Sequence, residues 1–198
     1  MTLAKRLFDL FWSILGLIII FPLLIIVSIL IKIDDKGPIF FRQERVGYKG
    51  KPFKMWKFRT MVVNAEKKGL QLTIGKDPRI TRVGNLLRKS KIDELPQLFN
   101  VIAGEMSLVG PRPEVPYYVA MYDDNQRKVL DIMPGITDPS SIEYRDESEL
   151  LSKSDDSERT YIEEIMPEKI RLNLEYAQKA NVFRDFVVIV KTLLKILK

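Results

Sequence analysis

A long uncharged stretch near the N-terminus constrains this chain more than any other feature. No charged residue occurs from Leu10 to Ile31, and about 22 residues at about 1.5 Å each are enough to cross a hydrocarbon core of about 30 Å. The length of the stretch and the lack of a small-residue cleavage site argue against a secretory signal peptide. A buried helix of a soluble protein is the alternative. We expect the stretch to enter a membrane.

Two topologies are open for this stretch: a straight spanning helix and a re-entrant helix that leaves on the side from which it entered. Lys5 and Arg6 precede it, and Lys32 and Lys36 follow it. The positive-inside tendency therefore favours keeping both ends cytoplasmic. Pro22 removes a backbone donor near the middle and predicts a bend at Phe21 and Pro22. Spanning helices also tolerate proline, so the re-entrant form is only slightly favoured by composition.

The composition limits the chemistry available to the chain. It has 198 residues, no His and no Cys, which excludes disulfides, Cys or His zinc sites, and nucleophile systems that use an imidazole base. Carboxylates, Lys, Arg, Tyr, hydroxyls or a hard metal ion must carry any catalysis. The formal charge of +6 and a basic stretch from Lys32 to Arg59 indicate an anionic partner.

The remaining pattern predicts an α+β fold that is mainly helical. Strands are expected over Pro38–Arg45 and Phe53–Phe58, joined by a Gly-containing turn into a small β-hairpin. A helix is expected from about Met61 to Lys68, and another from Pro167 to about Ala180.

The C-terminal stretch from Val182 to Lys198 has the periodicity of an amphipathic helix. Its apolar residues recur at steps of three and four and share one face, with a basic stripe on another. Such a helix suits a membrane interface, and an ordinary surface helix packed on the core is the alternative. The apolar face comprises Phe183, Phe186, Val187, Val190, Leu194 and Leu197.

The densest cluster of polar residues runs from Arg88 to Gln97 and contains Asp93 and Glu94 next to each other. One interpretation is structural, because Asp is a favoured N-cap, acids complement the helix dipole, and Pro96 is tolerated in a first turn. Spacing alone favours that interpretation.

The other interpretation of this cluster is catalytic. Without His or Cys, a carboxylate is a reasonable covalent nucleophile, and it can also hold Mg²⁺, which prefers oxygen ligands and substrate phosphates. Phosphoryl transfer needs little beyond positioning and cations that absorb charge. Arg59, Arg88 and Arg112 are candidate phosphate-binding cations, and the prolines that flank Arg112 stiffen its backbone.

Several segments in order along the chain resemble the monotopic phosphoglycosyl transferases, the minimal catalytic type of the bacterial sugar transferase family. The motifs that carry the resemblance cover most of the chain and are Lys5–Asp9, the apolar stretch with Pro22, Gly37–Gly47, Phe53–Met61, Ile92–Val101, Gly104–Glu114 and Pro134–Thr137.

The resemblance implies a fold, an activity and a location. Residues 1–36 would form a re-entrant membrane helix-break-helix, and residues 37–198 a catalytic domain on the cytoplasmic face of the bacterial inner membrane. Asp93 would match the family nucleophile, which attacks the β-phosphate of a nucleoside diphosphate sugar, expected to be a UDP-sugar. Glu94 would complete the dyad and Mg²⁺ would sit there, with Asp93 as a ligand. The acceptor would be polyprenol phosphate, expected to be undecaprenyl phosphate, and the product would begin surface glycans such as exopolysaccharide or lipopolysaccharide.

The chain departs from the family pattern after Thr137, where Asp138-Pro139-Ser140-Ser141 replaces the commoner Gly-Trp-Ala-Gln. An acidic stretch from Glu143 to Glu164 is also unusual. The resemblance therefore does not identify the residues that contact the sugar. A second hypothesis is a membrane-anchored basic binding protein without catalysis. Trp56 and Phe58 flank Lys57, which fits a strand with one buried face better than nucleic-acid stacking, so no nucleic-acid partner is expected.

Overall fold

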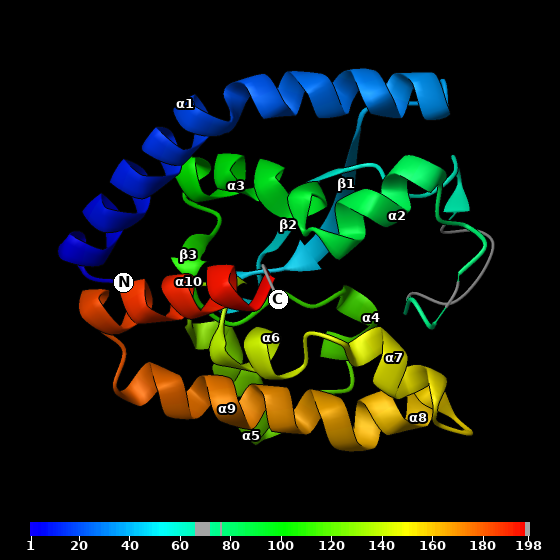
Figure 1. The fold of residues 1–198 in the computed structure, drawn as a ribbon. Coiled ribbons are helices and arrows are strands. Elements are labelled where there is room, and N and C mark those ends of the chain that lie inside the picture. The colour runs from blue at the N-terminus through cyan, green and yellow to red at the C-terminus, as the bar shows by residue number, and fades with distance from the viewer. Residues whose placement is uncertain (66–71, 76, 197–198) are drawn as a thin grey trace.

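A computed structural model describes residues 1–65, 72–75 and 77–196. Helices dominate, with α1 along one edge of the molecule, α9 along the opposite edge, and α2, α3 and α10 between them (Figure 1). This confirms the prediction of a mainly helical fold with a small hairpin. The elements are α1 (Leu3–Asp34), β1 (Phe40–Val46), η1 (Tyr48–Gly50), β2 (Pro52–Phe58), α2 (Arg82–Lys89), η3 (Ile92–Gln97), α3 (Leu98–Ala103), β3 (Ser107–Val109), α4 (Pro116–Val119), α5 (Asp124–Arg127), η4 (Lys128–Asp131), β4 (Gly135–Thr137), α6 (Pro139–Glu143), α7 (Glu147–Ser152), α8 (Ser157–Thr160), η5 (Tyr161–Ile165), α9 (Met166–Gln178) and α10 (Val182–Ile196).

The apolar stretch lies within α1, which is helical throughout and contains Pro22. It is one bent helix (Figure 1) instead of two helices separated by a non-helical break. Pro22 cannot donate to the carbonyl of Ile18, which provides a cause for bending. By length and composition α1 is the one helix among the described residues that could cross a membrane. The re-entrant topology and the division of the chain after residue 36 stay predictions.

The N-terminal part of α1 is tied to the rest of the protein by charged side chains. Lys5 Nζ donates to the carbonyl of Val109 (3.0 Å) and pairs with Asp185 of α10 (2.5 Å). Arg6 donates to two carbonyls at the end of α3, where helices leave acceptors unpaired. The buried carboxylate of Asp9 accepts from the hydroxyl of Ser107 (2.7 Å). The N-terminal part of α1 is therefore held against β3 and α10.

The hairpin pairs β1 with β2 in antiparallel register, from Phe40 opposite Phe58 to Val46 opposite Pro52. Phe58 packs in a buried cluster with the C-terminal half of α1 and with Leu87 of α2. The predicted helix from Met61 is wrong for residues 61–64, because Met61 instead forms an antiparallel bridge with Ile80, and only Ala65 lies in a 3-10 turn. Residues 66–68 of that prediction lie outside the described residues.

A short parallel pair, β3 and β4, leads into the turn that carries Arg112. At Gly110 an added Cβ would lie 2.2 Å from the carbonyl oxygen of Met133, and at Gly135 it would lie 2.1 Å from the Gly110 nitrogen. Only glycine allows these backbones to approach so closely. The largest buried cluster lies beyond this turn and joins α4, η4, α7, η5 and α9.

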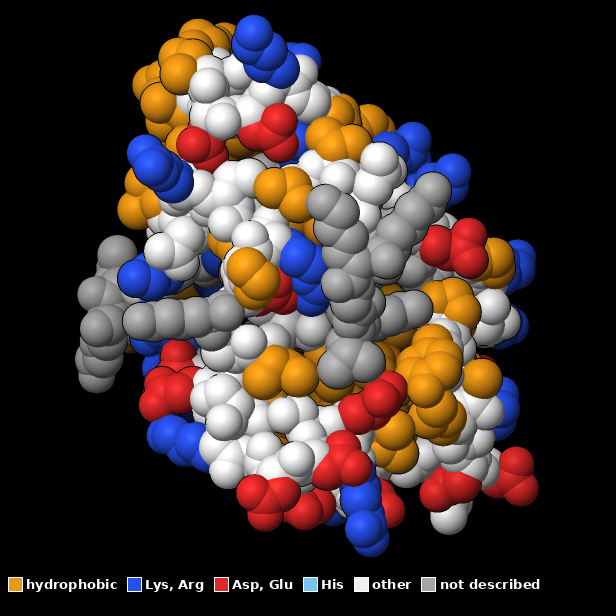
Figure 2. Space-filling view, turned by 90° about the vertical axis from the view of Figure 1, so that its right-hand side faces the viewer, with side chains coloured by type: hydrophobic (Ala, Val, Ile, Leu, Met, Phe, Trp, Pro, Cys, Tyr) orange, Lys and Arg blue, Asp and Glu red, His pale blue; other side chains and the backbone are white. Residues whose placement is uncertain are grey.

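The apolar face predicted for the C-terminal helix points outward. Phe183 is 75% exposed and Leu194 56%, whereas Asp185 and Val188 on the other side of α10 are buried. Most of this face therefore does not pack on the core, although Phe186 and Val190 line a cavity. Leu197 lies outside the described residues. Figure 2 shows hydrophobic side chains along the upper edge, where α1 lies, and acidic side chains concentrated toward the opposite end.

Candidate active site

One cavity of about 1510 Å³ connects the apolar helices with the polar residues predicted from the sequence. Asp93, Glu94 and Arg112 line it together with Trp12 of α1 and Val190 of α10. Its volume exceeds the 300–1,000 Å³ typical of small-molecule sites. The cavity therefore has room for a large substrate or for two substrates.

The Asp-Glu pair lies in a tight helical turn between α2 and α3. Lys91, in the left-handed region at φ 57°, precedes the first residue of η3, and Asp93 and Glu94 fall in its first turn. Asp93 is therefore not the N-cap, so that part of the structural interpretation is wrong, whereas both acids do lie in a first turn. Asn100 anchors the following helix to β2 by accepting from the Trp56 N–H (2.9 Å) and donating to the Lys54 carbonyl (3.1 Å).

The Asp93 carboxyl group is buried at 6% exposure. Its Oδ1 atom has no hydrogen-bond partner among the residues that the structure describes. Burial and the neighbouring Glu94 raise the pKa of Asp93 to about 6, although Lys57, Arg88 and Lys91 oppose the rise. A buried, unpaired carboxylate is costly, and strongly perturbed groups of this kind gather at functional sites.

Glu94 is paired where Asp93 is not. Arg112 holds it through both guanidinium NH groups, one at 2.9 Å, and Lys57 Nζ lies 3.3 Å from Oε1. Burial alone would raise the pKa of Glu94, but Arg112 and Lys57 outweigh it and hold that pKa well below its usual range. Burial lowers the pKa of Lys57 to about 8. The site therefore combines an unpaired carboxylate with a paired one.

The three predicted cations have different partners. Arg112 pairs with Glu94 as above. Arg88 donates to the hydroxyl of Thr73 (2.9 Å) and lines the cavity. Arg59 also lines the cavity, but its guanidinium is bound by the Asp35 carboxylate (2.5 Å) and by the Pro38 carbonyl (2.6 Å). These bonds give Arg59 a structural role at the end of α1, and phosphate binding by it stays a prediction.

The available donor atoms limit how Mg²⁺ could be held. Among the described residues there is no group of three or more acidic side chains of the kind that forms a complete metal site. Asp93 offers an unpaired carboxylate oxygen, and the Glu94 oxygens face Arg112 and Lys57. Mg²⁺ often binds through one or two carboxylates plus substrate phosphates, so the residues fit an ion that arrives with a phosphorylated ligand.

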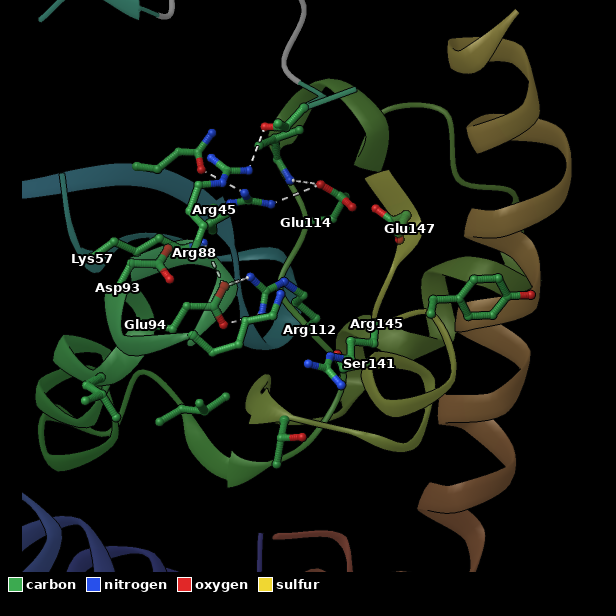
Figure 3. A pocket seen from close by; sticks show the side chains of 18 of the residues that line it. Arg45, Lys57, Arg88, Asp93, Glu94, Arg112, Glu114, Ser141, Arg145 and Glu147 are labelled. Carbon is green, nitrogen blue, oxygen red and sulfur yellow. Dashed lines mark hydrogen bonds and ion pairs between the residues drawn. The ribbon is translucent and has the colours of Figure 1, made fainter. Parts of the chain in front are cut away.

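Sequence reasoning missed Lys57 and a partly buried network behind Arg112. Glu114 accepts from Arg45 Nη1 (3.1 Å), from its neighbour's N–H, and from the hydroxyl of Tyr161 in the π-helical turn η5. Arg45 also donates to the Pro113 carbonyl (3.1 Å). The network fixes the turn that presents Arg112 (Figure 3). Strand alternation predicted a buried face at Trp56 and Phe58 and gave Lys57 no role. In the structure Lys57 reaches Glu94 from β2.

The fold and the site define the protein in outline: a long apolar helix lies beside one cavity that holds an unpaired carboxylate, a carboxylate paired with cations, and apolar side chains. The comparison with known families is more specific. A family model described as bacterial sugar transferase matches residues 1–198. The chain belongs to the bacterial sugar transferase family.

Curated relatives support the same assignment. A Bacillus subtilis protein, named provisionally as an undecaprenyl-phosphate N-acetylgalactosaminyl 1-phosphate transferase, is 44% identical over 67% of this chain and 70% of its own length. The Escherichia coli UDP-glucose:undecaprenyl-phosphate glucose-1-phosphate transferase is 35% identical over 98% of this chain but only 40% of its own length. The exopolysaccharide production protein ExoY of Sinorhizobium fredii is 34% identical over 96% of this chain and 84% of its own length.

Proposed function

We propose that this protein transfers a sugar 1-phosphate from a UDP-sugar to a polyprenol phosphate, giving a polyprenol diphosphate sugar and UMP. The observation that carries the proposal is the unpaired, buried Asp93 beside the Glu94–Arg112 pair in a cavity that also opens toward apolar helices. The relatives named for undecaprenyl phosphate as acceptor support the choice of substrates.

Asp93 is the proposed nucleophile. One carboxylate oxygen attacks the β-phosphorus of the donor, the bond between that phosphorus and the bridging oxygen breaks, and UMP leaves with the bond's electrons. The sugar phosphate is then an acyl phosphate on Asp93. In the second step an oxygen of the acceptor phosphate attacks the same phosphorus and frees the Asp93 carboxylate. Its raised pKa favours nucleophilicity while keeping most of the group ionised at pH 7.

The cations around the dyad absorb charge as it develops. Arg112 donates to the Glu94 carboxylate, and Lys57 reaches the same carboxylate from β2. Both side chains therefore place N–H groups near the proposed position of the reacting phosphate. Arg88 is the third candidate, from α2. Mg²⁺, held by Asp93 and the donor's phosphates, would neutralise the diphosphate. Glu94 orients Arg112 in this scheme and needs no proton transfer.

The acceptor lipid is proposed to enter between α1 and α10. Apolar side chains of both helices line the same cavity as Asp93, among them Trp12, Ile20 and Val190, and the outer faces of both helices expose large apolar residues. We place these faces in the cytoplasmic leaflet of the bacterial inner membrane, with α1 re-entrant and bent at Phe21 and Pro22. The acidic end then points away from the anionic lipid surface.

Release of UMP tests the proposal. The purified protein, given Mg²⁺, undecaprenyl phosphate and a panel of UDP-sugars, should release UMP from at least one donor, and removal of Mg²⁺ by a chelator should stop the release. A membrane-anchored binding protein without catalysis predicts no UMP from any donor. This role would place the protein at the first membrane step of surface glycan assembly, such as exopolysaccharide.

A further inference from the structure

A polar wall faces the cavity on the far side of Arg112 from Asp93. We define this polar wall as Ser141, Glu147, Lys169 and Asn173, all of which line the cavity. Figure 3 shows Ser141 and Glu147 on the opposite side of Arg112 from Asp93. The wall is built from α6, α7 and α9, and Ser141 and Glu147 lie in the segments where the sequence leaves the family pattern. The proposed transfer steps do not involve the polar wall.

Asn173 has an unpaired acceptor atom in this wall. It is only 5% exposed, and its Oδ1 has no hydrogen-bond partner among the residues that the structure describes. Its Nδ2 donates to Ser140 Oγ (3.1 Å), and Ser140 gives its only hydroxyl proton to Asp138. Ser140 can therefore only accept from Asn173, which fixes the orientation of the amide and leaves Oδ1 free for a donor.

The rest of the wall supplies both kinds of hydrogen-bonding group. Lys169 Nζ pairs with Glu147 Oε2 at 2.6 Å, and the two side chains are 15% and 25% exposed. Ser141 gives its proton to Asp138 (2.6 Å) and keeps its acceptor lone pairs. Asp138 is close enough to Arg112 that its charge, after that of Glu94, helps to raise the pKa of Arg112. The wall therefore adjoins the proposed phosphate site.

We propose that the polar wall binds the sugar ring of the donor and selects among sugars by their hydroxyl and amide groups. The inference rests on the proposed function. The sugar is attached to the phosphate that Asp93 attacks, so it must lie next to Arg112, whereas the base is one phosphate and one ribose further away. Sugar hydroxyls both donate and accept, which matches the Asn173 and Glu147 oxygens and the Lys169 ammonium. A site built for such bonds rejects a ligand that leaves them unpaired.

The test compares donors in the Asn173→Leu and Glu147→Gln variants. Rates of UMP release give kcat/KM for UDP-glucose, UDP-galactose, UDP-N-acetylglucosamine and UDP-N-acetylgalactosamine, and competitive inhibition by UDP reports the nucleotide site alone. We expect the ratio between best and second donor to fall at least about tenfold, with the inhibition constant of UDP unchanged within about twofold. Glu149→Gln, an exposed change on the same helix, is the matched control and should alter neither.

Unchanged ratios of kcat/KM between donors would overturn the inference. Equal weakening of the binding of UDP and of every donor would also overturn it, because the polar wall would then bind the nucleotide. Glu147→Gln keeps the test decisive if Asn173→Leu does not fold. Titration calorimetry measures the affinities of UDP-sugars and UDP for Asp93→Asn, with and without Glu147→Gln. These affinities report discrimination between sugars without turnover. Absence of UMP release by the unaltered protein would therefore refute the proposed function and leave the calorimetry to decide the inference.

Discussion

Replacing Asp93 by Asn should stabilise the fold while it abolishes turnover. Burial and Glu94 raise the pKa of Asp93 from 3.8 to about 6. At ~1.4 kcal/mol for each tenfold change in acidity, holding Asp93 ionised at pH 7.5 costs the folded state up to about 3 kcal/mol. Asn removes that charge at nearly constant volume. Allowing for the buried amide, we expect a gain of roughly 1–3 kcal/mol, or roughly 2–12 °C in Tm for a chain of this size.

The pH dependence gives the sign of the effect. A carboxyl group with a raised pKa in the folded state adds stability below its unfolded pKa, and this stability is lost as the pH rises from about 4 to about 6. The Tm difference between Asp93→Asn and the unaltered protein should therefore be small near pH 4.5 and complete above pH 7.

Glu94→Gln is the matched control for this prediction, because its neighbourhood is opposite in sign. Arg112 and Lys57 stabilise the ionised Glu94, so its neutralisation leaves two partly buried cations without their partner and should cost on the order of 3 kcal/mol. Thermal unfolding of the purified proteins in detergent measures both changes. An Asp93→Asn protein that is less stable than the unaltered one at pH 7.5, or a shift that is the same at pH 4.5, would refute the electrostatic account.

Three further outcomes are expected. The pH profile of kcat/KM should fall below about pH 6 as Asp93 is protonated and above about pH 8 as Lys57 loses its proton; Lys57→Arg should move the basic limit upward, and an unmoved limit would exclude Lys57. Initial rates should be ping-pong, and a requirement that both substrates bind together would count against the covalent route. Single cysteines at Thr2 and at the exposed Asp155 should both be protected from an impermeant thiol reagent in intact spheroplasts, whereas labelling of Thr2→Cys alone would mean that α1 spans the bilayer.

Local patterns were sufficient for several parts of the fold. Alternation predicted both strands of the hairpin, and Pro167 marked the first turn of α9. Periodicity placed the apolar face of α10 correctly but could not say whether it packs inward. Pro22 predicted a bend in the apolar helix, because proline acts on its own turn, and α1 is bent (Figure 1).

The parts that could not be predicted depend on contacts between distant segments. The sequence indicated that Lys5 and Arg6 are charges flanking a membrane helix. In the fold Lys5 pairs with Asp185, and Arg6 donates to carbonyls at the end of α3. The sequence favoured Asp93 as an N-cap. The turn instead begins at Lys91, whose left-handed backbone cannot be predicted from sequence periodicity. The pairing of Glu94 with Arg112 joins residues from different elements, and only tertiary structure brings them together.

Trapping the covalent intermediate tests the central claim most directly. The purified protein would be incubated with Mg²⁺ and a UDP-sugar labelled in the β-phosphate, without acceptor lipid, and digested for mass spectrometry. We predict a sugar phosphate adduct on the peptide that contains Asp93, absent from Asp93→Asn and discharged when undecaprenyl phosphate is added. Turnover without any adduct, or an adduct on another residue, would contradict the account.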